Sequence, residues 1–286
     1  RVKDERGSHT GVIQRPDAEG RWRCFLQVAT QVQFGRKQYL VLTSDITRQR
    51  RQNEQMELID RLTRALQGSL DLDRVLHLTL TCATAGHALG FNRAFVFLLD
   101  ADGEELRGAR AVGPTSPSRA ARIWEEIDRE KHSLEDLLGG EPGPGDVELT
   151  RIVRSVSLPV EDPGCLLAQV LNSDSPVIVH RAEEDDRVNP DLSDKLDLDE
   201  FVVVPLVAHD ERLGVMIADN RYSDASIDNA GAEQLRMFAA QASLAISNAR
   251  AYKRIREQIE EIRRTQKKLV ESERLASVGR MAAHLA

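Results

Sequence analysis

The beginning of the chain carries two segments in which apolar and polar residues alternate. Residues 25–34 alternate in part, the polar turn 35–37 follows, and residues 38–43 are again mainly apolar. A period of two places successive side chains on opposite faces of a strand. We therefore predict a β-hairpin between Trp22 and Thr43.

Two helical patterns follow the hairpin. Residues 48–67 contain no proline or glycine. Their apolar positions recur three and four residues apart, at Met56, Ile59, Leu62 and Leu66. Gly68 ends this pattern, and Asp71 or Ser69 can cap a second helix over residues 72–89 by accepting hydrogen bonds from its first amides. Apolar residues cover more than one face of the second helix, so we expect it to pack on a sheet.

Two further hairpins are predicted, each from two apolar segments on either side of a short polar turn. The first joins residues 93–99 to 105–112, and the second joins residues 201–208 to 213–219. Shorter elements are expected between them. These are a helix over 118–138, a proline- and glycine-rich loop over 141–145, strands over 152–158 and 177–179, and a helix over 166–171.

The last part of the chain carries three apolar stripes at helical spacing. The first is Leu235, Phe238, Ala242, Ala245, Ala249 and Tyr252. The second is Tyr252, Ile255, Ile259, Ile262, Gln266 and Leu269, and the third is Leu275, Val278, Ala282 and Leu285. Steps of three and four keep side chains on one coiled-coil seam, so we expect a long helix that pairs in parallel with that of a second copy. The alternative is one amphipathic helix packed on its own domain, but no later element follows to receive it.

The third stripe cannot be reached from the second in heptad steps, and such a break allows two packings of similar energy. Glycine inside a helix costs about 1 kcal/mol relative to alanine, which weakens the same region. Our hypothesis is that this segment relays a signal when an upstream domain rotates or shifts the helix. Its residues are Leu269, Leu275, Val278 and Gly279.

Composition narrows the class of protein. The 286 residues suffice for about two domains, and 41% of them are apolar. The net charge is −7, from 46 acidic and 39 basic residues, which disfavours nucleic-acid binding. The three cysteines are widely spaced and lack a C-x-x-C pair, which fits a reducing cytosol and predicts no zinc site.

Neither a membrane segment nor a metal site is expected from the sequence. The longest apolar run, residues 201–208, is far shorter than the ~20 residues of a membrane helix. We place the segment in the cytoplasm without membrane contact, although the parent protein could be anchored upstream. The seven histidines form no H-E-x-x-H pattern, and the acidic stretch over 183–200 lacks the calcium-loop spacing, so no metal is predicted.

Four short motifs and the order of the elements resemble a GAF domain over roughly residues 56–250. The motifs are Asn92-Arg-Ala-Phe, Val204-Pro-Leu-Val, Leu213-Gly-Val and the helical segment 238–249. The resemblance implies an α+β fold, in which an antiparallel sheet is flanked by helices. It also implies a ligand pocket, whose wall we place at Phe95, Phe97, Arg110, Cys165, His180 and Val203.

The ligand of that pocket stays open at this point. The N-K-F-D-E signature of cyclic-nucleotide-binding GAF domains is not reproduced, and a buried Cys165 is commoner than a reactive or bilin-attaching one. An unknown small molecule is one possibility. The domain could instead be a module that senses through haem, bilin or nucleotide and drives another output, or a structural dimerisation domain without ligand.

Both ends of the chain resemble parts of sensor histidine kinases of two-component systems. The stretch Ser44-Asp-Ile-Thr resembles the C-terminal edge of a PAS domain, of which only the final strands would be present. Residues 271–286 resemble the approach to the phosphoacceptor histidine, which the resemblance places directly after Ala286. His284 takes the place of a small residue in that pattern, so no catalytic residue is expected within the chain.

The resemblance implies four regions. They are the end of a PAS domain (1–48), a linker helix (49–68), a GAF domain (69–250) and a coiled coil that leads into the dimerisation and phosphoacceptor domain (251–286). The chain opens with Arg1 rather than Met and stops inside a motif, so we expect an internal fragment. The parent kinase would use ATP and Mg²⁺, act as a homodimer and pass phosphate to a response regulator.

Overall fold

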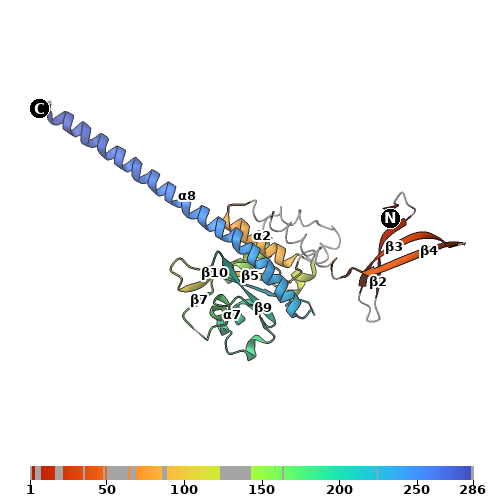
Figure 1. The fold of residues 1–286 in the computed structure, drawn as a ribbon. Helices are drawn as coiled ribbons and strands as arrows, with labels where there is room; N and C mark the ends of the chain where they lie inside the picture. Colours follow the sequence, from red (N-terminus) through yellow and green to blue (C-terminus); the bar gives the residue numbers. More distant parts are fainter. Residues whose placement is uncertain are drawn as a thin grey trace. The chain divides into compact units, whose positions relative to one another are not determined.

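The computed structural model describes residues 2–3, 8–16, 22–34, 36–47, 49, 64, 69–85, 89–122, 143–162, 164–223 and 225–284. The chain divides into two compact units, Arg1–Arg61 and Leu62–Ala286 (Figure 1). The predicted linker helix over 48–67 and most of the predicted helix over 118–138 lie outside the described residues.

The first unit is a four-stranded antiparallel sheet in the order β1-β2-β3-β4. Its strands are β1 (Val2–Lys3), β2 (Ser8–Pro16), β3 (Trp22–Phe34) and β4 (Arg36–Asp45). The predicted hairpin is confirmed as β3 and β4. Sequence reasoning missed β2, because glycine, proline and charged residues interrupt its apolar pattern.

Four consecutive apolar residues of β4 are exposed to solvent in this unit. Tyr39, Leu40, Val41 and Leu42 are each at least 51% exposed. Successive residues of a strand point to opposite faces, so both faces of the sheet carry exposed apolar side chains at this strand.

The exit from β4 is fixed to the neighbouring strand. The Ile46 amide donates to the Cys24 carbonyl at 2.9 Å, and the Cys24 amide donates to Thr47 Oγ1 at 2.9 Å. Asp45 Oδ1 accepts from the Thr47 amide at 2.9 Å. Hydrogen bonds from Thr47 lower the pKa of Asp45. The backbone that leaves the sheet therefore has a defined direction.

The second unit is built on a six-stranded antiparallel sheet in the order β7-β6-β5-β10-β9-β8. The strands are β5 (Arg93–Leu99), β6 (Glu105–Val112), β7 (Ser157–Pro159), β8 (Val177–Val179), β9 (Phe201–Ala208) and β10 (Glu211–Asp219). The predicted α+β class and both predicted hairpins are confirmed.

Helices cover both faces of this sheet. On one face, α5 (Pro144–Val153), α6 (Leu166–Leu171) and α7 (Pro190–Leu196) share a core with alternate strand residues such as Phe95, Phe97 and Val203. A short 3-10 helix, η1 (Ala182–Glu184), precedes α7. On the other face, α2 (Leu72–Thr84) and the long α8 (Asn229–His284) contact each other and the central strands (Figure 1).

The predicted helix boundaries are partly wrong. The Asp71 cap is confirmed, because Asp71 Oδ1 accepts from the Arg74 amide at 2.8 Å, but α2 ends at Thr84 rather than at residue 89. The predicted loop over 141–145 contains the start of α5, because Pro144 occupies the first helical position, where its missing N–H costs nothing. The predicted strand over 152–158 begins inside this helix, because α5 extends to Val153.

The predicted dimer seam in the first part of α8 is also wrong. Leu235, Phe238, Ala242 and Ala249 are at most 1% exposed, because this part of α8 packs on β9 and α2 of its own unit. The elements that receive the helix precede it in the sequence. Arg250 marks the end of this contact, where its Nη2 donates to the Leu99 carbonyl at 2.8 Å. Residues 251–270 are all exposed.

A buried ion pair joins the first residue of β5 to the last residue of β10. Arg93 is 2% exposed and Asp219 1% exposed, and Arg93 Nη2 lies 2.6 Å from Asp219 Oδ2. Arg93 Nε donates to the same carboxylate, and Nη2 also donates to the Asp197 carbonyl at 2.9 Å. The rings of Phe95 and Tyr222 lie 5.4 Å from the guanidinium carbon. The pair therefore ties β5, β10 and the end of α7 together.

We expect Asp219→Asn to lower the free energy of unfolding by about 3–5 kcal/mol, because it leaves the Arg93 guanidinium buried without its counter-charge. The matched control is Arg221→Gln, which breaks the exposed pair between Arg221 and Asp197 and should cost less than about 1 kcal/mol. Denaturant unfolding followed by circular dichroism measures both. Equal losses would contradict the role assigned to the buried pair.

Gly214 should tolerate no side chain. Its φ is 152°, and a Cβ built there would lie 2.0 Å from the Phe97 carbonyl oxygen of the neighbouring strand. Gly214→Ala must push β10 away from β5, which we expect to cost about 3 kcal/mol. Gly145→Ala is the control, since its Cβ would meet nothing closer than 3.5 Å. The same unfolding measurement should show little change for Gly145→Ala, and an equally stable Gly214→Ala variant would refute this account.

Candidate functional site

Four of the six residues assigned to the ligand pocket lie together in the core under α5, α6 and α7. Phe95, Phe97 and Val203 are 0% exposed, and Cys165, which precedes α6, is 6% exposed. Leu166, Leu167, Val170 and Leu171 of α6 belong to the same core. The side chains that were expected to line a cavity therefore pack against protein atoms.

Arg110 lies on the opposite face of the sheet. It pairs with Val96 in the β5–β6 ladder, while the next residue, Ala111, is in the core with Phe95. Its Nη1 lies 3.6 Å from Asp73 Oδ1 at the start of α2. The structure thus does not place Arg110 beside the four expected residues that share the core.

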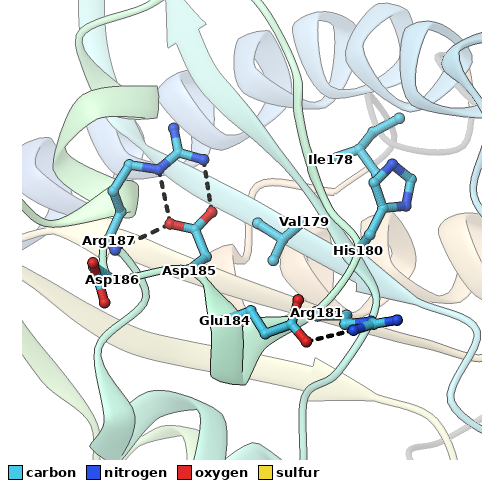
Figure 2. Close-up of a pocket in the computed structure, with 8 residues that line it drawn as sticks. All are labelled: Ile178, Val179, His180, Arg181, Glu184, Asp185, Asp186 and Arg187. Atoms are coloured by element: carbon cyan, nitrogen blue, oxygen red, sulfur yellow. Dashed lines mark hydrogen bonds and ion pairs between the residues drawn. The ribbon is translucent and has the colours of Figure 1, made fainter.

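His180 lies at the end of β8, beside a surface hollow of about 550 Å³. Figure 2 shows the eight residues around this hollow, with ion pairs from Arg181 to Glu184 and from Arg187 to Asp185. The His180 side chain is 73% exposed, and its Nδ1 lies 2.8 Å from Glu200 Oε1. Because most of its charged groups are already in ion pairs, this hollow offers few groups to a ligand.

A second hollow, of about 670 Å³, lies where α8 leaves the domain. Its residues come from the start of α2, the β5–β6 region, Arg154 and the segment 252–260 of α8. Arg154 Nη2 donates to Asp73 Oδ1 at 3.2 Å, and Arg154 Nε donates to the Ala109 carbonyl. We call this hollow the α2–α8 groove. Sequence reasoning missed it, because its residues are far apart in the chain.

Two buried nitrogen atoms of residues on this face of the sheet have no hydrogen-bond partner among the described residues. They are Nδ1 of His77 on α2 and Nε of Arg110 on β6. Burial lowers the pKa of His77, and the nearby Arg110 guanidinium lowers it further. Burial also lowers the pKa of Arg110. The sequence analysis assigned Arg110 to the expected pocket but did not connect it with His77, because no local motif links two residues so far apart in the chain.

The four residues assigned to signal relay all lie within α8, which is helical from Asn229 to His284. The Leu269 side chain is 61% exposed, and Leu275, Val278 and Gly279 follow on the same helix. In the described part of the chain, no cluster of three or more histidine, cysteine, aspartate or glutamate side chains could hold a metal ion. No described helix is both long and apolar enough to cross a membrane.

Comparison with known proteins identifies the second unit. A family model, the GAF domain, matches residues 56–246. Similar solved structures include the GAF domain of a Coxiella burnetii phosphoenolpyruvate-protein phosphotransferase, at 14% identity over 69% of this chain and 95% of that chain, with a TM-score of 0.48. The GAF domain of a two-component sensor histidine kinase from Bacillus halodurans shares 15% identity over 57% of this chain and 86% of that chain, with a TM-score of 0.36. No curated protein matches.

His77 should make stability depend on pH. Its folded-state pKa is lowered, so on acidification the unfolded state takes up a proton near pH ~6.5 that the folded state does not, and the free energy of unfolding falls. We expect His77→Gln to flatten this fall between about pH 7 and pH 5. The control is His209→Asn in the exposed β9–β10 turn, which should keep the wild-type pH dependence. Parallel stability–pH curves for wild type and His77→Gln would rule out this role.

Proposed function

Because the chain belongs to the GAF domain family, we propose that it is the sensory and signal-transmitting region of a two-component sensor histidine kinase. The observation that carries the proposal is the single helix α8. It packs on the GAF sheet at Leu235 and continues through Gly279 to His284, into the segment that resembles the approach to a phosphoacceptor histidine. A helix without interruption can pass a change at the sheet to its far end.

The exposed part of α8 supports a parallel homodimer. Tyr252, Ile255, Ile259 and Ile262 are each at least 44% exposed. Together with Gln266 and Leu269 they keep heptad spacing, which a second copy of the same helix fits. Burying these side chains against a partner removes an apolar stripe that water would otherwise surround.

The first unit supports the proposal that residues 1–48 end a PAS domain. The exit at Asp45, Ile46 and Thr47 is bonded to β3 through Cys24, so a shift in the sheet would move the start of the linker. The apolar residues of β4 are exposed, as expected for a sheet that packs against further elements. The linker, residues 49–68, would then carry this input to the GAF domain at 69–250.

The chemistry would belong to the rest of the parent protein. The proposed kinase binds ATP and Mg²⁺ in a later domain, phosphorylates a histidine after Ala286 and transfers the phosphate to an aspartate of a response regulator. We propose a cytoplasmic location for this segment, with residues 251–286 as the coiled coil toward that histidine.

One observation favours a second candidate, a GAF domain that dimerises its parent and takes no ligand in the expected pocket. Phe95, Phe97 and Val203 are fully buried in a packed core. A haem, bilin or nucleotide at that position would have to displace several side chains of α6.

Insertions in α8 test the kinase proposal directly. One alanine inserted between Leu269 and Leu275 rotates the following helix by about 100°, whereas seven restore its phase. We expect the single insertion to lock autophosphorylation of the full-length parent high or low, and the seven-residue insertion to keep regulation. Autophosphorylation is measured with labelled ATP.

The control for the output is replacement of the histidine after Ala286 in the full-length parent. Label that disappears with this histidine supports the kinase proposal. Label that persists without it, or equal regulation after both insertions, would contradict it and leave the structural dimer as the better account.

A further inference from the structure

Arg110 is a largely buried guanidinium whose Nε has no hydrogen-bond partner among the described residues. Its side chain is 13% exposed, and in the described part of the chain its one ion pair is to Asp73, at 3.6 Å. A guanidinium carries five N–H donors, and buried donors in folded proteins are almost always paired. Arg110 therefore has a donor that no group in the described part of the chain satisfies.

His77 adds a second unpaired nitrogen at the same place. The residue is 8% exposed, and its Nδ1 has no partner within the residues described here. The charges of Arg110 and Arg74 lower its pKa and that of Asp146 raises it, so His77 lies within electrostatic range of these groups. Both Asp146 oxygens already accept backbone amides, those of Gly113 and Gly143. Asp146 thus has a structural role, because its carboxylate holds these two backbone segments together.

A single exposed carboxylate now lies between two guanidinium groups. Asp73 Oδ1 lies 3.2 Å from Arg154 Nη2 and 3.6 Å from Arg110 Nη1, and the Asp73 side chain is 67% exposed. Charge-assisted hydrogen bonds between guanidinium and oxyanion are normally about 2.7–2.9 Å long. Asp73 therefore satisfies Arg110 poorly, and an oxyanion from solution can take its place.

The α2–α8 groove gives such an anion a way in. Asp73, Ala109 and Arg154 line the groove, and Ala109 directly precedes Arg110 in β6. Its volume of about 670 Å³ falls in the range of small-molecule sites. Apolar side chains also line it, namely Leu70, Leu72, Leu76, Leu98 and Tyr252. Acidic residues also line it, at Asp71, Glu257 and Glu260, and so do the basic residues Lys253 and Arg256. The end that can receive an anion is the one at Arg154 and Asp73, because Asp73 pairs with Arg110 there.

We propose that the α2–α8 groove binds a small molecule through a phosphate or carboxylate group, held by Arg110 and Arg154 beside His77 in place of Asp73. The apolar part of the ligand lies against Leu76 and Tyr252. Because Tyr252 belongs to α8, the ligand touches the helix that leaves the domain. This site is on the face of the sheet opposite Phe95 and Phe97, and it does not depend on the kinase output.

Titration calorimetry with phenyl phosphate, inorganic phosphate and benzoate on the full chain tests the proposal. We expect Arg110→Gln to weaken binding of phenyl phosphate at least about tenfold, because a bidentate partner is lost. Asp73→Asn should tighten it several-fold, because the competing carboxylate is removed. Arg107→Gln, on the same strand but in exposed ion pairs with Asp100 and Glu105, is the control and should bind like the wild type.

Two comparisons complete the design. Phenyl phosphate should bind more tightly than inorganic phosphate, because its ring contacts the apolar part of the groove. The affinities of phenyl phosphate and benzoate, compared with each other, show whether the site prefers a phosphate or a carboxylate. Asp73 is exposed, so Asp73→Asn should change binding without changing stability. Thermal unfolding shows whether the Arg110→Gln variant is still folded. Absence of binding at millimolar phenyl phosphate, binding unchanged in Arg110→Gln, or weaker binding in Asp73→Asn would overturn the site.

Discussion

The buried ion pair between Arg93 and Asp219 constrains how the strands of the second unit can be arranged. Neither charge can be buried alone at a tolerable free energy, so the start of β5 and the end of β10 must reach the interior together. Residues 93 and 219 are also direct partners in the antiparallel ladder, which fixes the register of the two central strands. The hydrogen bond from Arg93 to the Asp197 carbonyl also fixes the end of α7 relative to these two strands. The ion pair thus specifies the pairing of β5 with β10 more strictly than the burial of apolar side chains would, because apolar side chains can pack in more than one register.

The covering of this sheet on both faces decides where a ligand can bind. Under α6, the space is filled by leucine and valine side chains that contact Phe95 and Phe97. On the α2 and α8 face, the core ends near Arg250, polar groups such as Arg110 and His77 are buried, and Asp73, the ion-pair partner of Arg110, lines a groove. The two faces therefore differ in chemistry, although both belong to one sheet.

Periodicity and turn residues sufficed to predict the hairpins β3–β4 and β9–β10, and the Asp71 cap follows from the preference of aspartate for helix starts. The start of α5 was not predictable in this way, because Pro144 and Gly145 suit a loop as well as a first helical turn. The inner face of α8 was assigned to a second copy because its real partners, β9 and α2, come earlier in the chain.

The face of Arg110 shows why a site is harder to predict than a fold. Alternation counted from Leu106 puts residues 106, 108 and 110 on one face. An irregularity in the ladder between Val96 and Phe97 adds a residue to β6, so that Leu106 and Ala111 share the core and Arg110 turns away from it. One extra residue reverses every later side chain of a strand. Gly108 beside it is a residue typical of bulges, but one glycine does not by itself fix where the extra residue lies.

The anchoring of Arg250 on the Leu99 carbonyl gives α8 a pivot at the edge of the domain. From there to His284 the helix extends roughly 50 Å, at about 1.5 Å per residue. A tilt of about 5° at the pivot then moves the far end by roughly 4 Å, close to the rise of a helical turn. Small rearrangements near β5 are thereby converted into much larger displacements at the far end of the helix.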